Sequence, residues 1–468
     1  MLTRRAFLGR TLAALAAGAA ASGASRASRP NVLFVIVDDL NAWIGCLGGH
    51  PDARTPSIDA LAARGVAFGR AYCNAPACNP SRVSLFTGLR PSTSGVYDNQ
   101  QPFRRALPRA LTLQQQLMAH GYRVVGRGKV FHGGHPDPQS WSEYLPKGPN
   151  PAPPSVPQNG IPEAGHFDWG PLDVADDEMD DMKVVAWCAE RLGRRGAEPL
   201  FLACGLNTPH LPWYVPRSTF ERFDPEAVRL PRVLESDLDD VPPAGRRLVG
   251  RSRYHRRVVS HGAWGRAVAA YLASIAFVDK AVGRLVEAFD RSPYRDDTAI
   301  LLTSDQGFHL GEKLHWRKFA LWEEATRVPL VCVPPGGRTG ARCGRPVSLL
   351  DLYPTLCELC GVPGRPELEG VSLAPLLADP ERAWPRPAVS TEGRGNHSVR
   401  SERWRLIRYA DGSEELYDHE RDADEWHNLA SRPEHATLKR QLAAWLPGED
   451  APDAPRSGDP EAPPPASP

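Results

Sequence analysis

The strongest constraint on the fold is a set of apolar segments without polar–apolar alternation. The segment NVLFVIV at Asn31–Val37 is apolar and rich in β-branched residues, and segments 199–205 and 298–303 are similar. Such segments fit strands of a parallel sheet that is covered on both faces. Segments such as 267–289 have helical amphipathic spacing. With 468 residues, the chain has room for one large α/β domain and a smaller one.

Carboxylates follow two of these predicted strands. Asp38 and Asp39 come directly after 31–37, and Asp305 and Gln306 come just after 298–303. Ligands of open α/β sheets bind beyond the carboxyl ends of the strands. Adjacent carboxylates repel each other unless a cation or hydrogen-bond donors compensate. These oxygen ligands suit calcium or magnesium rather than zinc. The alternative is that one acid caps a helix and the other lies on the surface.

Basic and imidazole side chains are expected at the same edge of the sheet. Lys129 and His132 follow a strand predicted at 122–125, His210 follows 199–205, and Lys318 lies in a polar loop. Fixed cations together with a divalent metal stabilise a tetrahedral anion while its leaving oxygen becomes negative. The alternatives are a solvated basic turn at 126–132 and a structural histidine at 210.

A short motif places a cysteine beside a predicted anion site. Residues 73–88 read CNAPACNPSRVSLFTG, in which Pro80 suits the first position of a helix. A helix N-terminus attracts anions through its free N–H groups and dipole, and Arg82 adds a permanently charged planar donor set. We expect Cys78 to be a reactive side chain next to a bound tetrahedral anion. The alternative is a buried cysteine beside an ordinary capped helix.

The run CNPSRVSLFTG resembles the signature of type I (formylglycine-dependent) sulfatases, in which this cysteine is oxidised to formylglycine. Phe86 stands where the family usually has leucine, an apolar exchange that leaves the chemistry intact. The resemblance spans residues 30–429 and includes NVLFVIVDDL, GKVFHGG, NTPHLPW, TSDQGFHLGEK and LWEEATRVPL. Within the family, GKVFH, PHLP and the spacing of Trp316 and Lys318 look most like iduronate-2-sulfatases and their bacterial relatives. The resemblance implies the alkaline-phosphatase-like α/β fold: a large mixed sheet sandwiched by helices, then a small C-terminal antiparallel sheet subdomain.

The resemblance also implies a role for each candidate residue. One Ca²⁺ would be held by Asp38, Asp39, Asp305, Gln306 and the modified Cys78. Gln306 departs from the usual asparagine or histidine and has a longer arm. Arg82 and Lys129 would steady the modified side chain and the sulfate. His132 would take the proton when the sulfated hydrate breaks down. His210 and Lys318 would hold the sulfate and help protonate the leaving alcohol, and Asp305 would also serve as base.

Three functions remain open from the sequence. The first is a sulfatase. The second is a phosphate or phosphonate monoester hydrolase of the same superfamily, and the third is a non-catalytic relative that binds sulfated glycans. For a sulfatase we expect a 2-sulfated uronate-type saccharide, because arginines and aromatic residues such as Arg104, Arg105, Trp213 and Tyr214 are predicted to lie at the pocket rim. Simple alkyl or aryl sulfates are the alternative.

The two ends of the chain and its charge complete the predictions. Residues 1–29 read as a Tat-like signal peptide with Arg4 and Arg5, which predicts a periplasmic or secreted enzyme without a membrane span in the mature chain; a retained anchor is the alternative. We expect a catalytic domain at 30–380, an α+β subdomain at 381–446 and a disordered tail at 447–468. A net charge of +1 gives no case for nucleic acid as a partner. The expected partners are a sulfated small molecule or saccharide and, during maturation, a formylglycine-generating enzyme.

Overall fold

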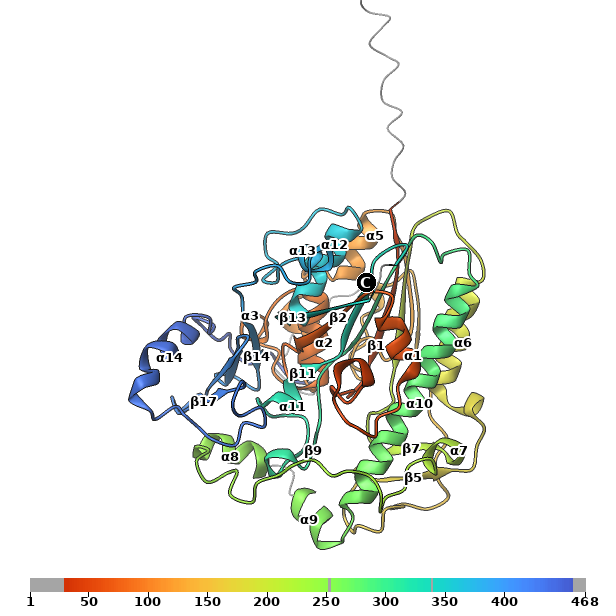
Figure 1. The fold of residues 1–468 in the computed structure, drawn as a ribbon. Helices are drawn as coiled ribbons and strands as arrows, with labels where there is room; N and C mark the ends of the chain where they lie inside the picture. Colours follow the sequence, from red (N-terminus) through yellow and green to blue (C-terminus); the bar gives the residue numbers. More distant parts are fainter. Residues whose placement is uncertain (1–28, 251–253, 338–339, 458–468) are drawn as a thin grey trace, which may run out of the picture.

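A nine-stranded mixed sheet lies at the centre of the computed structural model, which describes residues 29–250, 254–337 and 340–457 (Figure 1). The strands run in the order β11-β2-β12-β8-β1-β6-β3-β4, and β13 also pairs with β2. Their bounds are β1 (Asn31–Val37), β2 (Val66–Tyr72), β3 (Arg123–Gly128), β4 (Glu143–Pro146), β6 (Leu200–Leu206), β8 (Thr298–Ser304), β11 (Arg327–Val328), β12 (Leu330–Val333) and β13 (Ala341–Ser348). The strands β8, β1, β6, β3 and β4 are mutually parallel, whereas β12 runs antiparallel to β8 and β2.

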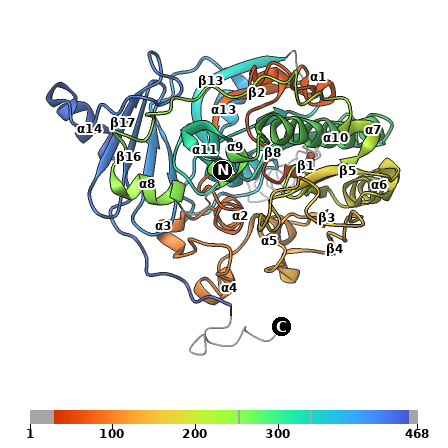
Figure 2. The same cartoon turned by 90° about the horizontal axis from the view of Figure 1, so that it is seen from below.

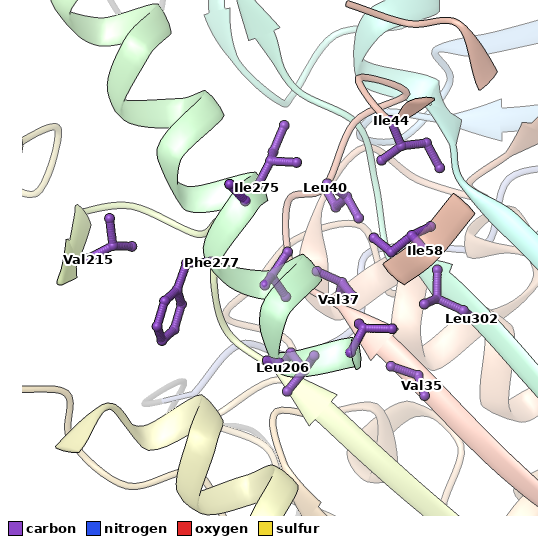
Figure 3. Close-up of a cluster of buried hydrophobic side chains, with 14 of the residues drawn as sticks. Val35, Val37, Leu40, Ile44, Ile58, Leu206, Val215, Ile275, Phe277 and Leu302 are labelled. Carbon is purple, nitrogen blue, oxygen red and sulfur yellow. The ribbon is translucent and has the colours of Figure 1, made fainter. Parts of the chain in front are cut away.

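Both faces of this sheet are covered, as the unbroken apolar segments predict. Alternate residues of β1 enter different cores: Val35 and Val37 belong to one cluster, and Phe34 and Ile36 belong to the other. Figure 3 shows Val35 and Val37 with Leu206 and Leu302 of the neighbouring strands beside a long helix. Burying each such side chain stabilises the fold by about 1.5–3 kcal/mol. The predicted mixed α/β class is therefore confirmed.

Helices on the two faces come from different parts of the chain. One face is covered by α1 (Pro56–Ala62), α6 (Asp180–Leu192) and α10 (Trp264–Asp290), which lie together on the right of Figure 1. The other face carries α2 (Cys78–Thr87), α5 (Leu113–Ala119), α12 (Leu352–Leu359) and α13 (Ala374–Ala378). The helix predicted at 267–289 is α10, which begins three residues earlier and ends one residue later.

Shorter elements connect these layers. The short helices are α3 (Pro91–Ser94), α4 (Phe103–Ala106), α7 (Arg217–Phe220), α8 (Pro243–Gly250), α9 (Tyr254–Ser260) and α11 (Glu323–Thr326). Two small sheets are formed by β5 (Trp169–Leu172) and β7 (Trp213–Pro216), and by β9 (His309–Leu310) and β10 (Trp316–Arg317). In the part of the chain that the structure describes, no helix combines the length and apolar character needed to cross a bilayer.

A four-stranded antiparallel sheet follows the central layers, as predicted. It contains β14 (Ala388–Thr391), β15 (His397–Arg400), β16 (Trp404–Arg408) and β17 (Glu414–Asp418), and α14 (Ala436–Ala443) packs against it. Viewed from below, this small sheet lies on the opposite side of the molecule from α6 (Figure 2). The predicted signal peptide at 1–29 falls almost wholly outside the described residues.

The C-terminal segment (residues 447–457) differs from the prediction of a disordered tail. Ala451, Ala454 and Ser457 donate backbone hydrogen bonds of 2.7–2.8 Å to carbonyl oxygens between residues 92 and 100, and the side chain of Ala454 is buried. Composition predicted disorder because the segment has little to bury, but its backbone groups find partners in another part of the chain. Residues 458–468 lie outside the described part.

Candidate active site

The parallel strands bring the predicted residues to one edge of the sheet. Strand β1 is in register with β6 and β8, so that Val37 pairs with Leu206 and with Ser304. The backbone ladder continues into the site: the Asp38 N–H donates to the Leu206 carbonyl (3.0 Å) and the Asp305 N–H to the Val37 carbonyl (3.3 Å). Since the sheet itself fixes these backbones, Asp38 and Asp305 are placed by the core rather than by mobile loops.

Lys129 enters the same edge from β3. Its N–H donates to the Gly205 carbonyl at 2.9 Å. The preceding Gly128 has a φ of +93°, and a Cβ there would lie 2.0 Å from the Gly205 oxygen. Only glycine fits this close approach of two strands, which sets where the Lys129 side chain leaves the sheet.

Helix α2 presents Cys78 at its first residue. The helix begins at Cys78, two residues before the predicted start at Pro80, with Ala77 as N-cap. Pro80 still lies in the first turn, where its missing N–H is not needed. Every residue of α2 is buried, and Cys78 is 1% exposed. The Asn79 side chain donates to the carbonyls of Gln101 (2.7 Å) and Asp98 (3.0 Å), which anchors the helix start to the loop at 97–101.

Arg82 joins three strand ends from within α2. Its Nε lies 2.7 Å from Oδ2 of Asp305, its Nη2 lies 3.2 Å from Oδ1 of Asp38, and its Nη1 donates to the carbonyls of Lys129 and of Val130 (2.8 Å for Val130). The guanidinium is fully buried. Burial opposes its charge, but the two carboxylates outweigh burial and raise the Arg82 pKa above its usual value. Arg82 is therefore a permanent cation that fixes the relative positions of Asp38 and Asp305.

Two lysines converge on Cys78. Lys318 places Nζ 2.9 Å from the Cys78 sulfur and 2.6 Å from Oδ1 of Asp39, and Lys129 forms an ion pair with Asp38. Burial alone would lower the pKa of each lysine, but the carboxylates raise both pKa values. Burial and the nearby Asp38 charge raise the pKa of the Cys78 thiol to about 12. At neutral pH the lysines are charged and the thiol is protonated.

Asp39 has a strained backbone that two groups hold in place. Its φ is +62°, a left-handed conformation that is uncommon for residues other than glycine. The Asp39 N–H donates to Oδ1 of Asp305 at 3.2 Å, and its carbonyl accepts from the hydroxyl of Tyr271 in α10 at 2.7 Å. Tyr271 was not predicted, because nothing in the apolar helix sequence distinguishes it from a core residue. Ser81 belongs to the predicted Cys78 motif, but its contact was not predicted: its hydroxyl donates to the Asp305 carbonyl at 2.5 Å.

The acidic residues fit a hard divalent cation. Asp38, Asp39 and Asp305 each offer a carboxylate oxygen, and these oxygens lie within 4.8 Å of one another. Burial raises the pKa of Asp305 to about 7 even though Arg82 lowers it, so the local donors do not offset the burial of this carboxylate. Gln306 donates through Nε2 to Asp39, while its Oε1 is buried without a partner among the described residues. An unsatisfied acceptor beside three carboxylates is the donor set that calcium or magnesium prefers.

Both predicted histidines reach the site and are neutral there. Burial and the charge of Lys129 lower the pKa of His132 to about 3, and its Nδ1 is buried without a partner among the described residues. The same two causes lower the His210 pKa. The His210 Nδ1 donates to the Leu211 carbonyl at 2.6 Å, which leaves Nε2, 4.0 Å from Asp39 Oδ2, without a proton. Neutral His132 suits a proton acceptor, and the predicted donor role of His210 requires that it first takes up a proton.

Four residues expected at the rim have other roles in the structure. Trp213 is 1% exposed and lies in the core. The Tyr214 hydroxyl donates to Asp168, and Arg104 forms an ion pair with Asp137 at 2.6 Å. Arg105 donates to the carbonyl of Arg456 at 2.7 Å. The prediction that these four residues line a sugar pocket is therefore wrong for Trp213, and Arg104 already has a carboxylate partner.

Comparisons with known proteins agree with this geometry. Residues 30–362 match the family model described as Sulfatase, and residues 311–450 match the model of the N-sulphoglucosamine sulphohydrolase C-terminal region. A "Sulfatase" of Formosa agariphila is 36% identical, with 90% of this chain and 87% of the relative covered. Human iduronate 2-sulfatase is 32% identical, with 74% of this chain and 68% of the relative covered.

Solved structures share the fold. The 2-O GAG sulfatase BT1596 superimposes with a TM-score of 0.72 at 23% identity, covering 89% of this chain and 91% of that structure. The phosphonate monoester hydrolase of Silicibacter pomeroyi gives a TM-score of 0.73 at 23% identity, covering 89% and 94%. At this identity the two structures show a common fold and carry no argument about substrate.

Proposed function

The chain belongs to the sulfatase family and is a sulfuric ester hydrolase, and from this premise we propose that it acts through a formylglycine made from Cys78 and one bound Ca²⁺. The observation that carries the proposal is the convergence of Lys318, Lys129 and Arg82 around a buried Cys78. The thiol itself is a poor nucleophile, because its pKa of about 12 leaves almost no thiolate near pH 7. A different group at position 78 resolves that difficulty.

The proposed formylglycine supplies, as its hydrate, one oxygen that attacks sulfur and a second hydroxyl that allows sulfate to leave as the aldehyde re-forms. The chain's own residues then have separate tasks. Lys318 holds a sulfate oxygen and donates a proton toward the leaving alcohol, since it is charged and lies 2.9 Å from Sγ of Cys78. His132 accepts the proton of the hydrate, because it is neutral and its Nδ1 has no hydrogen-bond partner among the described residues.

Calcium is proposed from the donor set. Asp38, Asp39, Asp305 and Gln306 would hold it, together with the modified residue 78, and the ion would stabilise the negative oxygens of the sulfate. Arg82 forms ion pairs with both Asp38 and Asp305 and so would hold these two ligands in position. His210 lies at the edge of this group and would contact a sulfate oxygen once it carries a proton.

Two measurements test the chemistry. The mass of the peptide that contains Cys78, prepared from protein made in its own host, should be lower by the difference between CH₂SH and CHO. A wholly unmodified protein with full activity would refute the nucleophile. Chelation should suppress turnover, and calcium should restore it better than zinc. Undiminished activity in protein shown by elemental analysis to be metal-free would refute the metal.

We propose a 2-sulfated uronate-type saccharide as substrate. The support is the identity to iduronate 2-sulfatase and the motifs GKVFH and PHLP. The test compares sulfate release from 2-sulfated uronate disaccharides, other sulfated sugars and an aryl sulfate. A higher kcat/KM for the aryl ester, with no saccharide turned over, would reject the saccharide and leave the sulfatase assignment intact.

A phosphate or phosphonate monoester hydrolase is the second candidate. Its support is the fold shared with the Silicibacter pomeroyi enzyme, and the site cations suit either anion. A phosphate monoester carries one more negative charge than a sulfate ester. Matched aryl sulfate and aryl phosphonate substrates separate the two functions, and a kcat/KM at least tenfold higher for the phosphonate would favour this candidate.

We also propose export through the residues at 1–29, with a periplasmic or secreted mature enzyme that begins near residue 30. The support is the pair Arg4-Arg5 before an apolar stretch. A formylglycine-generating enzyme is the proposed partner during maturation. Fractionation of the host, with Arg4→Lys/Arg5→Lys as the matched variant, tests export, and retention of both proteins in the cytoplasm would reject it.

A further inference from the structure

A guanidinium beside the site has no carboxylate partner in the part of the chain that the structure describes. Arg317 immediately precedes Lys318, and no described aspartate or glutamate lies within 4 Å of its nitrogens. Its Nε is buried without a hydrogen-bond partner among the described residues. A buried charged donor without a hydrogen bond is energetically unfavourable, and a ligand that accepts this hydrogen bond would remove the penalty.

Two aromatic rings hold this guanidinium in position. Cζ of Arg317 lies 5.6 Å from the ring centroid of Tyr254 in α9 and 5.5 Å from that of Phe319. Such contacts orient an arginine without neutralising it. Tyr254 in turn stacks on the buried Phe167, with ring centroids 4.1 Å apart. The guanidinium is therefore fixed by packing while its charge stays available.

The backbone around Arg317 is strained in a way that separates three neighbouring side chains. Arg317 has a φ of +79° and Phe319 a φ of +69°, both in the left-handed region. On one side, Trp316 is fully buried against Phe167, and on the other, Lys318 reaches Cys78. Strained backbone of this kind persists where the surroundings fix it, often at ligand sites. Here the strained backbone places Lys318 at Cys78 and leaves Arg317 half-buried beside it.

Arg317 adds a half-buried positive charge next to Lys318 of the site. In the inner cluster three carboxylates face three cations, namely Arg82, Lys129 and Lys318, so Arg317 is an additional positive charge. Partial burial of its ring and the charges of Arg317 and Lys318 lower the pKa of His166, a residue at the protein surface. Both cations therefore lie close to a surface residue.

We infer that Arg317 binds a second anionic group, a carboxylate or a second sulfate, on the molecule whose sulfate ester is cleaved at Cys78. The inference rests on the proposed function, because it requires a sulfated substrate at that position. A planar guanidinium held by two rings can donate two parallel hydrogen bonds to a carboxylate or sulfate. Arg317 thus selects sulfate esters that carry another negative charge close to the ester.

The test uses substrates that differ only in this second group. They are a 2-sulfated uronate disaccharide, its carboxyl-reduced counterpart, a disulfated disaccharide without a carboxylate, and a neutral aryl sulfate. Arg317→Gln should lower kcat/KM for the anionic substrates by about 10- to 100-fold, mainly through KM, as expected for a charge-assisted hydrogen bond. The loss should be at least tenfold larger than the loss for the neutral esters.

Two further variants control for structure. Arg317→Lys keeps the charge without the planar donor pair, and should recover only part of the lost selectivity. Arg295→Gln removes an exposed arginine that pairs with the adjacent Asp296, and should leave all four activities unchanged. Arg317→Gln should lower kcat/KM more for one of the two anionic substrates, and the second group of that substrate, carboxylate or sulfate, is the group that Arg317 binds.

The inference and the proposed function fail in different ways. If the wild-type protein releases sulfate from none of the four esters, the proposed function fails. If it cleaves the neutral esters as well as the anionic ones, or if Arg317→Gln lowers all four kcat/KM values equally, the role of Arg317 is overturned and the sulfatase chemistry stands. The ratio of the kcat/KM values for two substrates, measured with one protein preparation, does not depend on the fraction of enzyme that is folded.

Discussion

Two buried clusters of charged side chains in this protein both pair carboxylates with cations, but the cations offset burial to different extents. The active-site cluster contains three aspartates, and the interface cluster joins the small C-terminal sheet to the catalytic layers through Glu323 and Glu425. In the interface cluster, Arg405 pairs with both glutamates, at 2.5 Å in the case of Glu425, and Arg400 lies 3.2 Å from Glu323. Each cluster groups at least three side chains that could hold a metal ion.

The pKa values separate the two clusters. Burial would raise the pKa of Glu425, but Arg405 and His419 lower it to about 2. Burial raises the Asp305 pKa to about 7 against the effect of Arg82. The surrounding cations thus stabilise the Glu425 carboxylate, whereas they do not offset the burial of Asp305. We conclude that a buried acid indicates a ligand site where the surrounding protein cations and donors do not offset its burial.

The largest effect is expected from Cys78→Ala. Removal of the nucleophile should lower kcat at least about 1,000-fold, while the thermal midpoint should change little because one small side chain is lost. Sulfate release from an aryl ester and circular dichroism melting measure the two quantities. Cys46→Ala, which alters a half-buried cysteine in another segment, is the matched control. Activity of Cys78→Ala within tenfold of wild type would contradict the assignment.

At the interface cluster we expect a large loss of stability and a small loss of turnover. Arg405→Met leaves Glu323 and Glu425 with fewer partners, and breaking a buried ion pair from one side costs about 3–5 kcal/mol of unfolding free energy. Urea unfolding measures this loss, and turnover per folded molecule should fall less than tenfold. A change in unfolding free energy below about 1 kcal/mol, the level of an exposed pair, would remove the distinction between the clusters.

Acid should weaken the interface cluster selectively. The folded pKa of Glu425 is about 2, below its ordinary value of 4.5, so the carboxylate contributes stability above pH 4.5 that is lost as the pH falls toward 2. Glu425→Gln should be less stable than wild type at pH 7, by on the order of 1–3 kcal/mol, and the gap should narrow progressively as the pH falls from 4.5 toward 2. A gap that stays constant between pH 7 and pH 2.5 would show that the charge of Glu425 is not the cause.

The smallest effect is expected for His419→Gln. His419 belongs to the interface group that could hold a metal, but it is already bonded to Glu425 at 2.8 Å. Calcium content measured after dialysis should stay at one ion per chain in this variant and fall toward zero in Asp39→Asn. Loss of the ion from His419→Gln would reverse the assignment of the two clusters.

The central strands and the site edge could be predicted because their signals are local. Asp38 follows β1 and Asp305 follows β8 within one residue, so recognising the strand also locates the acid. The motif around Cys78 is likewise contiguous. The mixed sheet and the convergence of these residues therefore followed from short stretches of sequence.

Supporting contacts could not be predicted because their partners are distant in sequence. Tyr271 and Asp39 are 232 residues apart, and the Tyr271 hydroxyl sits in a helix whose apolar spacing reads as core. Arg104 and Trp213 were assigned to the pocket from residue type alone. Residue type does not reveal that Arg104 pairs with Asp137 or that Trp213 lies in the core. The C-terminal segment escaped prediction for the same reason, since its partners lie between residues 92 and 101.

The enclosure of Cys78 has a consequence for the order of events during biosynthesis. Cys78 is 1% exposed, Asn79 is held by the loop at 97–101, and that loop is held by the C-terminal segment. During synthesis, residue 78 leaves the ribosome more than 370 residues before residue 451. This corresponds to an interval of about 20–75 s at ~5–20 residues per second. The proposed modifying enzyme is therefore expected to act before the C-terminal segment pairs with the loop at 97–101. In the folded chain Cys78 is enclosed, so a molecule that folds unmodified is expected to keep its thiol.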